Sequence, residues 1–79
     1  MSILKVSIRQ VKAARALLGW SQTRLAELSG VSEPTIKRLE AGDGELGGRA
    51  STVEAIRAAL EGAGIEFTNG GEPGVRLKA

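Results

Sequence analysis

Residues 22–41 read QTRLAELSGVSEPTIKRLEA, and this stretch decides the fold of the 79-residue chain. It divides into two short helical segments on either side of a Gly-Val-Ser turn at residues 30–32. Ser21 is placed to cap the first segment and Ser32 to cap the second, and Gly30 occupies the position where a positive φ is expected. Two short helices joined by a three- or four-residue turn that contains glycine form a helix-turn-helix arrangement.

The apolar residues of this stretch keep the spacing that two crossing helices need. Ala26 lies four residues before Gly30, where a small side chain allows the helices to approach each other closely. The apolar positions expected between the helices are Leu25, Val31, Ile36 and Leu39. Each of these signals is weak alone, whereas the whole set in one register is a specific prediction of both helices and of the turn between them.

Two further helices are predicted outside this stretch. Upstream, Ser7–Gln10 reads as a capping box that opens a helix ending near Gly19. Downstream, residues 42–50 carry four glycines and are predicted to form a loop. Ser51–Glu54 reads as a second capping box, which opens a helix running to about Ala63.

After the last helix the apolar period changes from helical to alternating, which is typical of strands. Residues 65–78 are therefore predicted to form a β-hairpin around the turn sequence NGGEPG. A lone hairpin is at best marginally stable in water, so its apolar face must pack on the helices, most of all on the fourth. That face is expected to comprise Ile65, Phe67, Val75 and Leu77.

These elements define a mainly α fold, in which one compact four-helix domain over residues 1–79 carries a C-terminal β-hairpin. Apolar residues at helical spacing are expected to form its core. They are Ile8, Val11, Leu18, Leu25, Ala26, Val31, Ile36, Leu39, Val53, Ile56 and Leu60.

Composition excludes several classes of protein. The chain has no Cys and no His, which excludes disulfides, zinc and iron–sulfur sites and histidine acid–base chemistry. We expect no cofactor and no enzymatic activity. With 42% hydrophobic and 25% charged residues the composition is globular, and no apolar run approaches the ~20 residues of a membrane span. The N-terminus lacks the apolar segment of a signal peptide, so we expect a soluble cytoplasmic protein that does not contact a membrane.

Charge is distributed unevenly along the chain. Residues 1–26 carry five basic side chains and no acidic one, whereas residues 27–79 carry six basic and nine acidic side chains, which leaves a net charge of +2. This segregation is compatible with a nucleic-acid partner, but many solvated helices have a similar pattern.

Residues 14–22, ARALLGWSQ, and the stretch at 22–41 resemble the Cro/C1 (XRE) family of bacterial and phage regulators. The resemblance extends over about residues 7–63. It implies a compact helical DNA-binding domain with its helix-turn-helix at residues 21–41 and its third helix in the major groove. The hairpin at residues 65–78 departs from the family pattern, in which a fifth helix is often found there.

The resemblance also implies which residues contact DNA. They are Gln22, Ser32, Glu33, Pro34, Lys37, Arg38 and Arg49. The chemistry of the third helix agrees, because Arg38 can bind guanine O6 and N7 bidentately, Glu33 can accept from cytosine N4, and Pro34 can contact a thymine methyl group. Lys37 can reach a base or a phosphate, and Gln22 is expected to donate to a phosphate. Arg49, with the backbone N–H groups that open the fourth helix, is expected to clamp another phosphate.

Structural roles compete with some of these assignments. Glu33 also fits a first-turn acid that stabilises the positive end of its own helix, and Lys37 and Arg38 also fit solvated surface charges. Trp20 is expected to pack in the core rather than to stack on a base. Arg15 and Glu40 match family positions that pair across the first and third helices, so we expect a structural ion pair there.

Two functions from different classes remain open. The first is a sequence-specific transcriptional regulator that binds a double-stranded DNA operator as a homodimer, since one recognition helix reads few bases and paired half-sites are the usual solution. The second is a protein-binding antitoxin or antiactivator with the same fold. The acids Glu33, Asp43 and Glu45, close to the expected DNA face, keep this second function open. We expect the dimer to form through an edge of the hairpin, which pairs with the hairpin of the second copy. Residues Ile3–Val6 of the same chain could instead add a strand to that edge.

Overall fold

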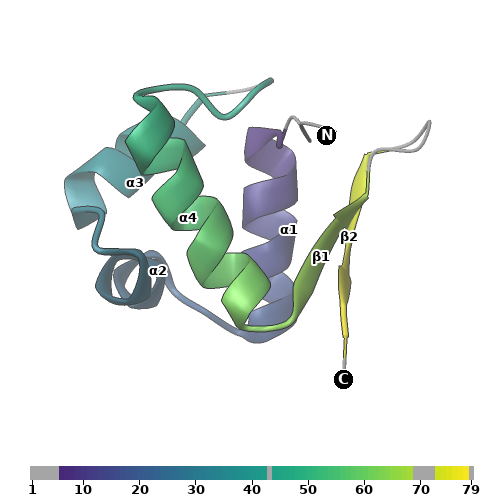
Figure 1. Ribbon diagram of the computed structural model, residues 1–79. Helices are drawn as coiled ribbons and strands as arrows, with labels where there is room; N and C mark the ends of the chain where they lie inside the picture. The colour runs from purple at the N-terminus through teal and green to yellow at the C-terminus, as the bar shows by residue number, and fades with distance from the viewer. Residues whose placement is uncertain (1–5, 43, 69–72, 79) are drawn as a thin grey trace.

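The computed structural model of the protein describes residues 6–42, 44–68 and 73–78. It is mainly helical with a C-terminal antiparallel hairpin, as the sequence predicts (Figure 1). The helices are α1 (Ile8–Leu18), α2 (Gln22–Ser29), α3 (Glu33–Glu40) and α4 (Ala50–Gly62), and the strands are β1 (Ile65–Thr68) and β2 (Gly74–Leu77).

The predicted starts of the first three helices and the predicted ends of the first two are confirmed. Ser7 forms the expected capping box with Gln10, and α1 ends at Gly19 with φ 70°. Ser21 accepts a hydrogen bond from the backbone N–H of Arg24 at the start of α2. Gly30 ends α2 with φ 74°, and no heavy atom lies close to the place of its missing Cβ. Glycine is therefore required here by the backbone conformation and not by close packing.

The predicted start of the fourth helix is wrong. The helix begins at Ala50, with Arg49 as its N-cap and with no side-chain hydrogen bond to the cap. Its hydrogen bonds already start at the Val53 N–H, which donates to the Arg49 carbonyl at 3.0 Å. Ser51 therefore lies within the first turn and cannot act as the cap of a capping box.

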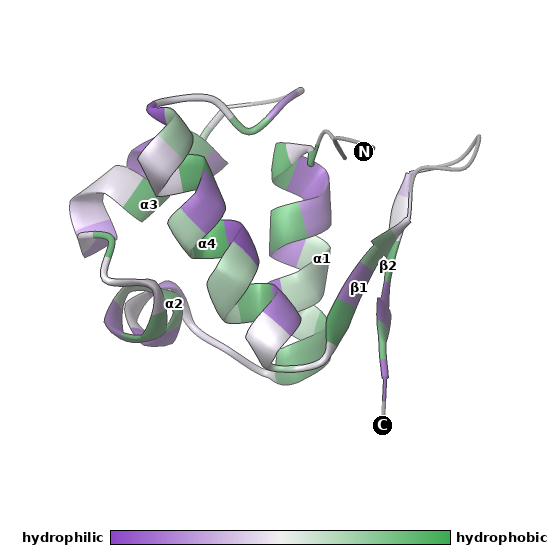
Figure 2. Ribbon diagram, in the orientation of Figure 1, coloured by the Kyte–Doolittle hydropathy of each residue, from purple (hydrophilic) through white to green (hydrophobic). Residues whose placement is uncertain are grey.

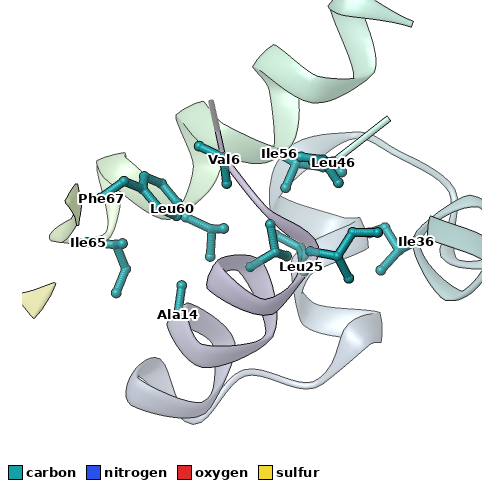
Figure 3. Packing of buried hydrophobic residues seen from close by; sticks show 11 residues of the cluster. Val6, Ala14, Leu25, Ile36, Leu46, Ile56, Leu60, Ile65 and Phe67 are labelled. Atoms are coloured by element: carbon teal, nitrogen blue, oxygen red, sulfur yellow. The ribbon is translucent and has the colours of Figure 1, made fainter. Parts of the chain in front are cut away.

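The core gathers side chains from all four helices and from β1. Figure 3 shows apolar side chains from these elements pointing toward one another. Of the predicted core, six residues are buried and the other five, Leu18, Ala26, Val31, Leu39 and Val53, are half-buried against them. Trp20 also packs there, as expected. The core additionally contains Val6, Ala14, Leu46, Ile65 and Phe67.

The hairpin pairs in the predicted way, but it packs on two helices rather than mainly on the fourth. Ile65 lies opposite Leu77 and Phe67 opposite Val75, so the apolar residues alternate with polar ones along both strands (Figure 2). β1 packs on α4, whereas β2 packs on α1. Within the expected turn, residues 69–72 lie outside the described residues.

A buried glutamine attaches the hairpin to α1. Gln10 is 4% exposed, and its Oε1 accepts from the Ser7 N–H at 2.8 Å. Its Nε2 donates to the carbonyls of Thr68 and Gly74 at 3.1 and 2.9 Å. One amide therefore satisfies polar groups on the cap of α1 and on both strands.

We expect Gln10→Leu to destabilise the protein by about 1–3 kcal/mol. The apolar side chain fits the core, but it leaves buried polar groups without these partners. Chemical denaturation measures the loss, and amide hydrogen exchange in β1 should accelerate more than in α2. Ala16→Leu, at an exposed position of the same helix, is the control. Equal stabilities for the two variants would contradict the role of Gln10.

The segment before α1 pairs with the glycine-rich loop and not with the hairpin. The Leu46 N–H donates to the Val6 carbonyl at 2.9 Å, and the Ile8 N–H donates to the Gly44 carbonyl at 2.8 Å. Ser7 and Glu45 form an antiparallel bridge between these bonds. The prediction that residues 3–6 could pair with the hairpin edge is therefore wrong for Val6. The other three residues, 3–5, lie outside the described residues.

No helix in the described ranges has the length and apolar character needed to cross a membrane.

Candidate nucleic-acid interface

α3 divides into a buried face and an exposed face. Ile36 and Glu40 are buried against the other helices, whereas Pro34, Lys37 and Arg38 are exposed. The exposed residues recur at the spacing of one helical face. The surface that α3 presents to solvent is therefore the one that the sequence assigns to DNA.

Two residues at the start of α3 have partners within the helix. Ser32, also exposed, is the N-cap, and its Oγ accepts from the Thr35 N–H and donates to Thr35 Oγ1 at 2.8 Å. Glu33 forms an ion pair with Lys37 at 3.4 Å, one turn further along. In this structure the Glu33 carboxylate therefore has a cationic partner on its own helix, and it also lies in the first turn of α3.

Arg38 and Arg49 both line one depression between α3 and the start of α4. The depression is lined by Thr35, Arg38, Leu39, Gly48, Arg49 and Thr52. Both arginines are exposed, and no carboxylate among the described residues pairs with either guanidinium. Two unneutralised guanidinium groups from separate elements thus border the same hollow.

The helix that opens at this depression has no side-chain cap. Because Arg49 is the N-cap and provides no acceptor, the first-turn N–H groups of α4 have no side-chain partner. A helix N-terminus with free N–H groups favours an anion through hydrogen bonds and through the helix dipole. These N–H groups therefore lie close to the positive charges of Arg38 and Arg49, and all of them favour an anion at the same place.

A buried ion pair holds α3 in place behind this surface. Arg15 donates from Nε to Glu40 Oε2 at 2.8 Å and from Nη2 to Glu40 Oε1 at 2.6 Å. The Arg15 side chain is 18% exposed and that of Glu40 is 4% exposed. Arg15 Nη1 also donates to the Trp20 carbonyl at 3.0 Å. The expected pair between the first and third helices is therefore present, and it also fixes the turn before α2.

A helix-turn-helix family model matches residues 11–60, which include α2 and α3 and most of α1 and α4. The chain belongs to the Cro/C1-type helix-turn-helix family. No curated protein matches it. The fold of this helix-turn-helix protein is that of DNA-binding regulators. The exposed face of its α3 carries Pro34, Lys37 and Arg38.

In this helix-turn-helix protein, Gln22 lies closer to the ion pair than the sequence suggests. Its Nε2 donates to Glu40 Oε1 at 2.9 Å, and its side chain is half-buried. The amide nitrogen has a second hydrogen for another acceptor. Gln22 thus connects the start of α2 to the end of α3 through Glu40.

The environment of Glu40 keeps its carboxyl group ionised. Burial raises the pKa of Glu40, but the hydrogen bonds from Arg15 and Gln22 and the nearby charges of Arg15 and Lys12 lower it by more, so that the pKa lies below its usual value. The carboxylate therefore remains charged, and able to accept all three hydrogen bonds, at neutral pH.

The exposed residues of α3 were predictable from the sequence, but three features of this surface were not. The missing side-chain cap of α4 was not predicted, because Ser51 and Glu54 read as a capping box. The Gln22–Glu40 bond gives no local signal, because the two residues meet only when α2 and α3 cross. The depression shared by Arg38 and Arg49 likewise appears only in the folded chain.

Proposed function

We propose that the protein is a sequence-specific DNA-binding transcriptional regulator that reads an operator with α3 in the major groove. The observation that carries this proposal is the pair of unneutralised guanidinium groups, Arg38 and Arg49, between the exposed face of α3 and the uncapped start of α4. A DNA backbone offers a row of phosphates to such a surface, and the major groove admits a helix beside it.

The exposed face of α3 supplies groups suited to base edges. Arg38 binds guanine O6 and N7 bidentately, and Pro34 contacts a thymine methyl group. Glu33 and Lys37 exchange their mutual ion pair for hydrogen bonds, Glu33 to cytosine N4 and Lys37 to a base or a phosphate. Ser32 keeps its capping bonds and approaches the backbone or a base edge.

Phosphates fix the position of the helix on the duplex. Arg49 and the first-turn N–H groups of α4 clamp one phosphate, and the second amide hydrogen of Gln22 donates to another. Because Gln22 also binds Glu40, a phosphate held there is connected directly to the end of α3. One recognition helix reads few base pairs, so we infer that the regulator acts as a homodimer on a pseudo-palindromic operator.

The proposal is tested by the binding of the purified protein to random-sequence duplex DNA across a range of salt concentrations. We expect binding that weakens steeply as salt rises, because each phosphate contact releases counterions. Absence of salt-sensitive binding to any duplex would contradict the proposal and favour the protein-binding antitoxin or antiactivator. Of the acids that keep this alternative open, Glu33 is neutralised by Lys37, and Asp43 lies outside the described residues.

Arg49→Ala is expected to weaken binding to all DNA sequences by a similar factor and to reduce the salt slope by about one. The reason is that a phosphate contact carries no base information. Titrations of one selected and one unrelated duplex measure both effects. Arg57→Ala, further along α4 where the guanidinium pairs with Glu61, is the control and should leave the slope unchanged. A loss confined to the selected duplex would show that Arg49 reads a base.

A further inference from the structure

We propose that two copies of the chain associate by antiparallel pairing of their β2 strands about a two-fold axis at Val75, which joins the two hairpins into one four-stranded sheet. This inference rests on the proposed function, in which paired half-sites require paired recognition helices. α3 lies on the side of the molecule away from the hairpin (Figure 1), so pairing through β2 leaves the recognition helix uncovered.

The outer edge of β2 carries backbone groups suited to another strand. The Lys78 N–H donates to the Gly64 carbonyl at 2.8 Å, so the hydrogen-bonded pairs within the hairpin fall on alternate residues, with Arg76 opposite Glu66 and Gly74 opposite Thr68. The N–H and C=O groups of Val75 and Leu77 consequently point away from β1. Among the described residues no third strand pairs with this edge.

Apolar side chains beside this edge are exposed. Leu77 is 41% exposed and Leu17 is 48% exposed. Gln10 and Gly74 are hydrogen-bonded at one end of α1 and β2, and the two elements run in the same direction (Figure 1). Seven residues of helix and three of strand both advance about 10 Å, which brings Leu17 level with Leu77. An apolar surface thus adjoins a free strand edge, and a second strand there buries both.

Charge decides the register of the pairing. An axis at Arg76 sets two arginines directly opposite each other, and like charges in that position are destabilising. An axis at Val75 instead sets Arg76 opposite Gly74 of the second copy, which has no side chain to oppose it. Arg76 then keeps its ion pair with Glu66 in its own hairpin.

The same register covers the exposed apolar groups. Val75 lies opposite Val75 of the second copy, which makes a continuous apolar row with the buried Phe67 of each hairpin. Leu77 lies opposite Pro73 of the second copy, and its N–H donates to that proline carbonyl. Proline has no N–H to donate in return, so Leu77 and Pro73 form one hydrogen bond where two other residues would form two. The edge is therefore complementary to itself, and the occupant is a second copy.

The test is the molar mass of the purified protein, measured by light scattering over a range of concentrations. We expect a dimer for the wild type and for Val75→Thr, and a monomer for Val75→Pro. Proline removes the outward N–H of Val75, which the hairpin itself does not use, and circular dichroism checks that the variant is folded. A monomeric wild type, or a folded Val75→Pro that remains dimeric, would overturn the proposal.

Nuclear magnetic resonance of the wild type tests the register without any substitution. In a dimer of labelled and unlabelled chains we expect an intermolecular contact between the α-protons of Gly74 and Arg76, since these residues form the closely spaced pair beside the axis. The Val75 amide proton should exchange faster as the protein is diluted. A contact between the two Arg76 α-protons, or exchange at Val75 that is fast at every concentration, would contradict the inference. Neither result bears on whether the monomer binds DNA, which the salt titration measures separately.

Discussion

Arg15→Ala is expected to destabilise the protein by about 3–5 kcal/mol, because it leaves the buried Glu40 carboxylate without its ionic partner. A chain of this length has a free energy of unfolding on the order of 4–12 kcal/mol, so the loss is a large fraction of the total. The substitution also removes the bond to the Trp20 carbonyl. Thermal and chemical denaturation, followed by circular dichroism, measure the effect.

Lys12→Ala is the control for this prediction, since it removes an exposed cation from the same helix that acts on Glu40 only at a distance. It should shift the stability by less than about 0.5 kcal/mol. The double replacement Arg15→Met with Glu40→Met should recover part of the loss of the single variant, because it removes the unpaired charge. An Arg15→Ala protein as stable as the control would show that the ion pair contributes nothing to the fold.

The lowered pKa of Glu40 gives this pair a pH dependence. Because the folded-state pKa lies below the usual value of 4.5, the stabilisation is fully present above that value and is lost as the pH falls through the folded-state pKa. Unfolding followed as a function of pH should therefore show wild-type stability declining below about pH 4.5, with a shallower decline for Glu40→Gln. Parallel curves for the two proteins would contradict the assignment.

Arg38→Ala is expected to weaken binding to the selected operator by about 1–3 kcal/mol, roughly 5- to 150-fold, and to relax the preference at one base pair. Arg38 is exposed on α3 and is not paired with any carboxylate of the described residues, so its removal should leave the fold intact. Competition titrations with operators altered at single positions measure both effects.

Arg49→Ala provides the comparison, because the two arginines border the same depression. Arg49→Ala should weaken binding while preserving every base preference, whereas Arg38→Ala should alter one preference. Identical base preferences for wild type and Arg38→Ala would place Arg38 on a phosphate and remove it from sequence reading.

The features of this fold that were predictable from sequence are those set by neighbouring residues. The cap at Ser7, the left-handed glycines at Gly19 and Gly30, and the alternation along the hairpin all depend on local chemistry. Family resemblance added the pair of Arg15 and Glu40, which no local pattern contains.

The features that sequence analysis missed depend on distant parts of the chain meeting. Gln10 reads as half of a capping box, and only the folded chain brings the carbonyls of both strands to its amide. Leu46 lies in a glycine-rich loop, yet it is buried because the loop bonds to the segment before α1. The start of α4 was misplaced because Ser51–Glu54 has the residue types of a capping box, whereas the backbone turns helical at Ala50.

The central claim is that the exposed face of α3 reads the sequence of a DNA duplex, and in vitro selection from a random duplex pool tests it most directly. Repeated binding and amplification with the wild-type protein should enrich a pseudo-palindromic motif whose half-sites are about one helical turn apart. The enriched duplexes should bind more tightly than the starting pool at the same salt concentration. A pool that stays random after selection, with binding equal for every sequence or absent, would contradict the claim.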